Sequence, residues 1–149
     1  MHTIDNLTKT ILCAKRRSFL RSKPVFECVA PTSEAELYRL ATGLNFKFTT
    51  GLAKWLRMAG FGDIDGTLQF RQDCFSVLDR DPLVGHVSFA QDTKGNSYAF
   101  DQNSGRICCY RPSDQKVICI ADNFPSFMQE LVRRDYKLED WLASLYSHK

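Results

Sequence analysis

The sequence predicts one α+β domain, in which an antiparallel meander sheet of about four to six strands is flanked by N-terminal and C-terminal helices. Three observations predict this fold. Apolar residues recur at helical spacing before residue 60 and after residue 123, and between these segments they form short runs separated by turn residues. The 149 residues are also 44% hydrophobic and 12% aromatic, which is enough apolar side chain for a single core.

A basic segment opens the chain, and its apolar residues predict an amphipathic helix. This helix should begin behind Thr3, which can act as N-cap, and should run to about Phe19. Its repeating apolar residues are Ile4, Leu7, Ile11 and Leu12. Asp5 is accompanied by an excess of cations, which are Lys9, Lys15, Arg16, Arg17, Arg21 and Lys23. We therefore expect residues 1–30 to form a basic helical extension with its cations on a solvated face.

Two further helices are predicted in tandem before the sheet. Ser33 can accept a hydrogen bond from the amide of Glu36 while the Glu36 side chain reaches back, which is a capping box. Gly43 is expected to end this helix in a left-handed conformation. The next helix should begin near residue 49 or 50 and end at Gly60, which we expect to be a structural turn residue.

The centre of the chain has the pattern of an antiparallel meander. Gly95 and Asn96 are expected as structural turn residues after the first strand, and Gly105 suits a positive φ in the next turn. The predicted strands cover residues 84–90, 97–100, 106–110 and 117–120.

The chain should end in two amphipathic helices that cover one face of the sheet. Either Asp122 or Asn123 can cap the first of them. The apolar stripes are Phe124, Phe127, Met128, Leu131 and Val132 in the first helix, and Leu138, Trp141, Leu142 and Leu145 in the second.

The six cysteines predict no metal centre, because none forms a C-x-x-C pair or another zinc-ligand spacing. Cys108, Cys109 and Cys119 lie in apolar runs, where thiols usually serve as small buried hydrophobes. The chain has no apolar core of a signal peptide and no run long enough to span a bilayer. We therefore expect a soluble cytoplasmic protein with reduced thiols, no cofactor and no membrane partner.

The search for catalytic residues leaves one serious histidine. His86 lies between Gly85 and Val87 in a predicted strand, where a histidine is more often structural than a general base. No G-x-S-x-G, H-E-x-x-H or Walker motif is present. A non-enzyme is expected, and an enzyme that uses His86 with a nearby aspartate or Cys108 is the alternative.

Aspartates gather in the central region and are our candidate residues for binding a partner. Any single one of them is equally well explained as a turn residue that bonds its own backbone. Like charges in neighbouring loops, however, persist only if they are solvated or matched by a partner. The candidates are Asp63, Asp65, Asp73, Asp79, Asp81 and Asp92.

Four stretches together resemble the SUKH superfamily, which includes the Smi/Knr-like domains. They are SEAEL at 33–37, LAKWL at 52–56, FAQDTKGNSYAFD at 89–101 and DNFPSF at 122–127. The resemblance covers residues 31–134 and leaves 135–149 as an added C-terminal helix. It implies a helix-flanked sheet that binds a protein, in bacteria chiefly as an immunity protein against a toxin domain, and it implies no catalytic residues.

Two other functions stay open at this point. A regulatory scaffold of the Smi/Knr type would bind an endogenous protein, and yeast relatives of that type regulate cell-wall synthesis. A nucleic-acid-binding module would use the basic N-terminal segment, although no aromatic stacking platform is interleaved with it. For either protein-binding function we expect a monomer or a weak homodimer.

Overall fold

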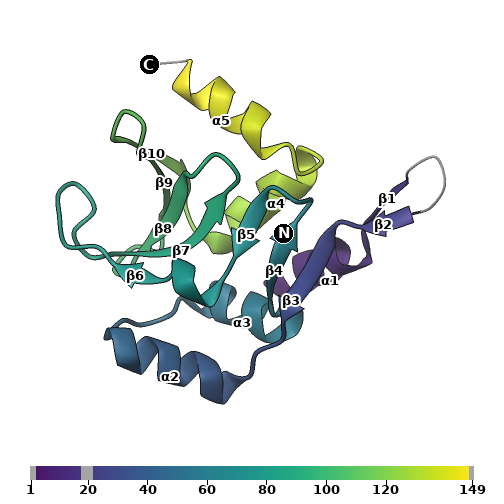
Figure 1. Ribbon diagram of the computed structural model, residues 1–149, viewed down its shortest axis with the longest axis horizontal. Coiled ribbons are helices and arrows are strands. Elements are labelled where there is room, and N and C mark those ends of the chain that lie inside the picture. Colours follow the sequence, from purple (N-terminus) through teal and green to yellow (C-terminus); the bar gives the residue numbers. More distant parts are fainter. Residues whose placement is uncertain (1–2, 18–21, 148–149) are drawn as a thin grey trace.

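An antiparallel sheet forms the centre of the computed structural model, which describes residues 3–17 and 22–147. Seven strands follow the order β10-β9-β8-β7-β5-β4-β3, and β6 pairs with β7 as the eighth (Figure 1). The strands are β3 (Phe26–Ala30), β4 (Phe61–Ile64), β5 (Leu68–Phe70), β6 (Ser76–Val77), β7 (His86–Asp92), β8 (Ser97–Asp101), β9 (Ile107–Arg111) and β10 (Lys116–Ala121). A separate two-stranded ribbon pairs β1 (Lys15–Arg17) with β2 (Ser22–Pro24).

Helices flank this sheet at both ends of the chain, as the α+β prediction requires. They are α1 (Ile4–Cys13), α2 (Glu34–Leu44), α3 (Thr50–Ala59), α4 (Phe124–Arg133) and α5 (Leu138–Tyr146), with the 3₁₀ turn η1 (Gln72–Cys74). The predicted meander is present as β7, β8, β9 and β10, paired in that order. The sheet is nevertheless larger than expected. Strands β4, β5 and β6 have only four, three and two residues, and β3, with the sequence FECVA, shows no regular alternation of apolar residues.

The first helix is shorter than predicted. It ends at Cys13, and Ala14 has extended backbone with its N–H bonded to the carbonyl of Ile11. Lys15–Arg17 then forms a strand instead of a cationic helix face, because Arg16 is bound by two distant aspartates. Phe19 and Arg21 lie outside the described residues.

The N-terminal segment is part of the domain core. Ile4, Leu7 and Ile11 are buried on the face of α1 that packs against α3 and α4. Strand β3 pairs with β4 and so forms one edge of the sheet. Residues 4–30 therefore contribute a helix and a strand to the fold.

The capping box predicted at the start of α2 is present in part, because the Glu36 side chain accepts from the Ser33 hydroxyl and not from the Ser33 amide, and the end predicted for α2 is wrong. The Ser33 hydroxyl accepts a hydrogen bond from the Glu36 amide at 3.2 Å. Gly43 lies inside the helix, and Asn45 (φ 59°) ends it in the left-handed conformation. Asparagine tolerates this conformation because its short polar side chain can bond locally. Helix α3 ends at Gly60, whose φ is +82°.

Aromatic side chains fill the space between the sheet and the helices. Phe89 of β7 lies 5.9 Å from Phe124 and 6.4 Å from Phe127, both in α4, measured between ring centroids. Trp55 of α3 is fully buried and lies 5.6 Å from Phe70 of β5. Helices α3 and α4 thus cover one face of the sheet, here called the helix face.

A substitution at Gly62 tests how closely β3 and β4 are paired. A Cβ atom at this position would overlap the Glu27 carbonyl oxygen and lie 2.6 Å from Cζ of Phe26. We expect Gly62→Ala to lower the free energy of unfolding by about 3 kcal/mol, because overpacking at a backbone contact cannot relax.

Gly43→Ala is the matched control, since nothing lies within 4 Å of the Cβ atom that this substitution would add. This helical substitution should raise the free energy of unfolding by about 0.5–1 kcal/mol. Urea denaturation followed by tryptophan fluorescence measures both changes. Equal stability of the two variants would contradict the close pairing of β3 and β4.

Candidate functional site

The sheet face opposite the helices, here called the open face, carries a groove of about 320 Å³. Strand register places Ser88, Ala99 and Cys108 side by side, and it places Tyr110 beside Ser97. Because successive residues of a strand point to opposite faces, these side chains lie away from Tyr98 and Phe100 of the core. Ser88, Ser97, Ala99, Tyr110 and Val117 form the floor of the groove.

Residues 72–85, here called the acidic loop, form the wall of this groove. The loop is anchored at its base, where the buried Ser88 hydroxyl donates to the carbonyl of Cys74 at 2.7 Å. Phe75 is buried and stacks on Phe46 with ring centroids 5.8 Å apart. The Leu78 amide donates to the carbonyl of His86 at 2.9 Å. These contacts hold a surface loop in a defined position beside the groove.

The acidic loop presents charge and apolar surface together. Asp73, Asp79 and Asp81 are all exposed, and Asp73 and Asp81 line the groove. The loop contains one cation, Arg80, which also lines the groove. Val77 and Val84 are 39% and 57% exposed, respectively. Exposed apolar side chains among polar ones are typical of surfaces that bind other proteins.

Two other predicted aspartates are matched by arginines of the chain itself. Asp63 lies 2.6 Å from Nη1 of Arg71, and Asp65 lies 3.1 Å from Nη2 of Arg16. Both carboxylates are about one quarter exposed. The structure therefore brings Asp73, Asp79 and Asp81 together in one loop and places Asp63 and Asp65 in internal ion pairs.

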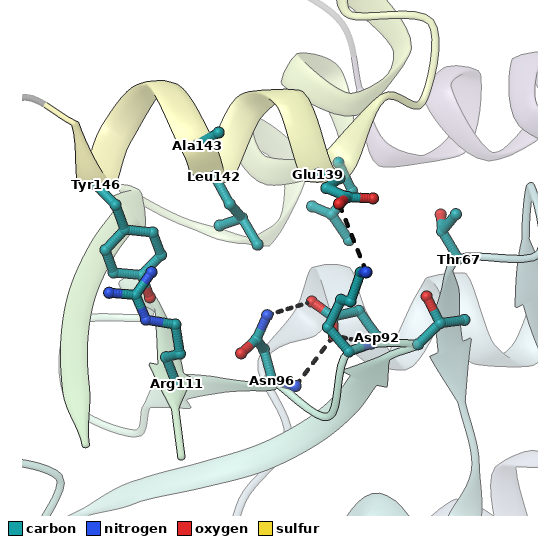
Figure 2. A pocket seen from close by; sticks show the side chains of 11 residues that line it. Thr67, Asp92, Asn96, Arg111, Glu139, Leu142, Ala143 and Tyr146 are labelled. Atoms are coloured by element: carbon teal, nitrogen blue, oxygen red, sulfur yellow. Dashed lines mark hydrogen bonds and ion pairs between the residues drawn. The ribbon is translucent and has the colours of Figure 1, made fainter. Parts of the chain in front are cut away.

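Asp92 is buried below the turn between β7 and β8. Its carboxylate accepts hydrogen bonds from the amides of Lys94 and Asn96, from the Asn96 side chain and from the Tyr98 hydroxyl, at 2.7 to 3.0 Å. Gly95 has a φ of +85°, which completes the turn. Figure 2 shows Asp92 and Asn96 facing each other beside a hollow, here called the second hollow, that is described next. The carboxylate of Asp92 therefore stabilises this turn.

The second hollow lies between α5 and the β7–β8 turn, and its volume is about 190 Å³ (Figure 2). Leu142 and Ala143 line its helical side. Arg111 stacks on the ring of Tyr146 at 3.8 Å from the centroid, and Lys94 lies 3.8 Å from Glu139. Small-molecule sites usually have about 300–1,000 Å³ and offer unpaired polar groups. The contacts here hold α5 to the sheet.

The groups of the enzyme alternative come together on the open face. Nε2 of His86 lies 3.8 Å from Sγ of Cys108, and Asp101 is the cross-strand neighbour of His86. Burial, together with a hydrogen bond to Cys119, raises the pKa of the Cys108 thiol to about 12. This thiol can therefore attack only when a base takes up its proton, whereas the nucleophilic cysteines of enzymes have a lowered pKa. Within the described part of the chain, Nδ1 of His86 also has no hydrogen-bond partner that would orient the ring.

The basic N-terminal segment is partly used inside the molecule. Arg16 binds Asp65 and Asp135, and these hydrogen bonds raise the pKa of its guanidinium. Lys23 lies 3.1 Å from Glu27. Lys15 and Arg17 are exposed in β1. The cations predicted as one surface thus divide between internal ion pairs and solvent.

Comparison of the chain with protein-family models, with curated protein sequences and with solved structures gave no match. In residues 3–17 and 22–147, no three histidine, cysteine, aspartate or glutamate side chains are grouped so as to hold a metal ion. No helix in these two ranges combines the length and the apolar character needed to cross a membrane.

Variants of Asp92 and Asp73 compare a carboxylate that holds the structure together with an exposed one. We expect Asp92→Ala to lower the free energy of unfolding by about 3 kcal/mol, because buried donors, among them the Tyr98 hydroxyl, would lose their acceptor. Asp73→Ala should change it by no more than about 0.5 kcal/mol. Urea denaturation of both variants measures the difference, and an Asp92→Ala variant as stable as Asp73→Ala would contradict the structural role.

Proposed function

We propose that this chain is a non-catalytic protein-binding domain, and that it neutralises a cognate bacterial toxin domain by docking it against the acidic loop and the groove. The observation that supports this most is the acidic loop itself. It combines three exposed aspartates with two exposed valines beside a groove on the open face. Binding residues are often carried on loops that a rigid scaffold positions, and this loop is anchored to β7.

Charge indicates the kind of partner surface that would fit. The chain has a net charge of +3, yet the acidic loop carries three aspartates against Arg80. At physiological salt, charges act over about 8 Å, so the local excess of aspartate governs docking more than the total charge does. A basic cleft is the natural complement, and a toxin that cleaves nucleic acid needs such a cleft to bind phosphates.

The SUKH resemblance supports the same proposal through the order of the elements. Within residues 31–134, the helices α2 and α3 precede the meander and the aromatic helix α4 follows it, which is the order that the resemblance implies. An immunity protein of this type would work in the cytoplasm, where it meets the toxin before harm is done. A regulatory scaffold of the Smi/Knr type would use the same surface, and only the identity of the partner separates the two functions.

Co-expression with the products of the adjacent genes tests the proposal. We expect one of these products to be toxic to the host when expressed alone, and to form a stable complex with this chain that restores growth. A neighbour that binds without being toxic would favour the regulatory scaffold. Neighbours that neither bind nor inhibit growth would refute the immunity function.

Neutralising the acidic loop should weaken the complex. We expect the double variant Asp73→Asn, Asp81→Asn to bind the toxin about tenfold more weakly at physiological salt, with the difference shrinking as salt rises. Asp5→Asn, Asp140→Asn is the matched control, because it removes the same charge from two exposed helical positions. Titration calorimetry measures the affinities, and equal weakening in both variants would place the contact elsewhere.

A further inference from the structure

Two cysteines face each other across the last two strands of the sheet. The register of β9 and β10 pairs Cys108 with Cys119, and their Sγ atoms lie 3.1 Å apart. Directly opposed residues of antiparallel strands have Cα atoms about 4.5–5.5 Å apart. A disulfide spans Cα distances of about 4.4–6.8 Å. The backbone therefore already has a spacing at which these sulfurs can bond.

The two thiols differ in access to solvent. Cys119 is exposed, whereas Cys108 is only 3% exposed. An oxidant from solution thus reaches Cys119 first, and Cys108 is placed to react with Cys119 from inside. The remaining cysteines are arranged differently. Cys109 points to the helix face, where its sulfur accepts from the Tyr146 hydroxyl. Cys74 is buried in η1, and Cys13 and Cys28 lie exposed on α1 and β3.

A base is in place for the buried thiol. Nε2 of His86 lies 3.8 Å from Sγ of Cys108, within hydrogen-bond reach of a thiol. Asp101 and Arg106 are the charged groups that act on this thiol, with opposite effects on its ionisation. Burial holds the pKa of Cys108 high, so an acceptor for its proton is needed before it can react.

We propose that Cys108 and Cys119 form a redox-active dithiol, which a small disulfide of the glutathione class oxidises to an intramolecular cross-strand disulfide with the help of His86. The proposal is independent of the proposed function. The modification site lies on the open face, two residues along β9 and β10 from Tyr110 and Val117, which line the groove.

The reaction proceeds by two thiol–disulfide exchanges. Cys119 gives its proton to water, and its thiolate attacks one sulfur of the oxidant. The oxidant's S–S bond breaks, one small thiolate leaves and takes up a proton from water, and a mixed disulfide forms on Cys119. Cys108 then gives its proton to Nε2 of His86 while its sulfur attacks Sγ of Cys119. The second small thiolate leaves and takes up that proton. The protein loses two electrons and two protons, and one small disulfide becomes two small thiols.

Oxidation of the full chain in glutathione buffers tests the dithiol. We expect peptide mapping by mass spectrometry to find Cys108 linked to Cys119, with little glutathione retained on either residue. Cys119→Ser should lose this linked peptide completely, and it should fold normally because the position is exposed. Cys13→Ser, also at an exposed position, is the control and should keep the linked peptide in full.

The same oxidation in concentrated urea shows whether the fold creates the pair. The unfolded chain should give mixed pairings among its cysteines in place of the single link. Stable glutathione adducts on folded Cys119 without the linked peptide would overturn the proposal. So would a Cys108–Cys119 link that forms equally well in the folded and unfolded chain.

His86→Gln tests the second exchange separately. Without the imidazole, the glutathione adduct on Cys119 should accumulate, and closure of the disulfide should slow about tenfold or more. Formation of the adduct itself should keep its rate, because Cys119 is attacked from solvent. Stopped reactions analysed by intact mass give both rates, and an unchanged rate of closure would overturn the role of His86.

Discussion

The aromatic layer between the sheet and the helices is the contact on which the rest of the structure depends. Phe89 lies at its centre, with Phe70 beside it in the sheet and Phe124 and Phe127 facing it from α4. Each such pair adds about 0.5–1.5 kcal/mol to the burial of apolar surface. Because this layer occupies the helix face, the polar residues of the same strands are left on the open face. The position of the groove follows from this division.

A second constraint ties the ends of the fold together. Arg16 in β1 donates hydrogen bonds to Asp65 and to Asp135, and its guanidinium lies 5.8 Å from the ring centroid of Tyr136. These contacts join three segments that are far apart in the sequence. They also pair the charge of Arg16 with two carboxylates, so less of the positive charge in the N-terminal segment is unpaired.

The features that could bind a partner or react lie together on the open face. The acidic loop, the groove and the Cys108–Cys119 pair lie on it, and the strand register gives their relative positions. Asp92 is the opposite case, because its buried carboxylate accepts hydrogen bonds from Asn96 and Tyr98 and is not available on the surface. The position of an acidic residue on the sheet therefore decides whether its side chain is available on the surface or is used to hold the fold together. Composition alone does not distinguish these two roles.

The sequence by itself determined the α+β class, the meander and most helix starts, because caps, turns and apolar periodicity act within a few residues. The sequence also contained a signal for Cys108 opposite Cys119 that our prediction did not use, since each cysteine lies two residues from the facing end of its predicted strand, 106–110 or 117–120. Only the tertiary structure decided that α1 joins the core, that short strands such as β5 extend the sheet, and that Arg16 is bound internally. Those outcomes depend on contacts between residues up to 119 positions apart, for which local patterns hold no information.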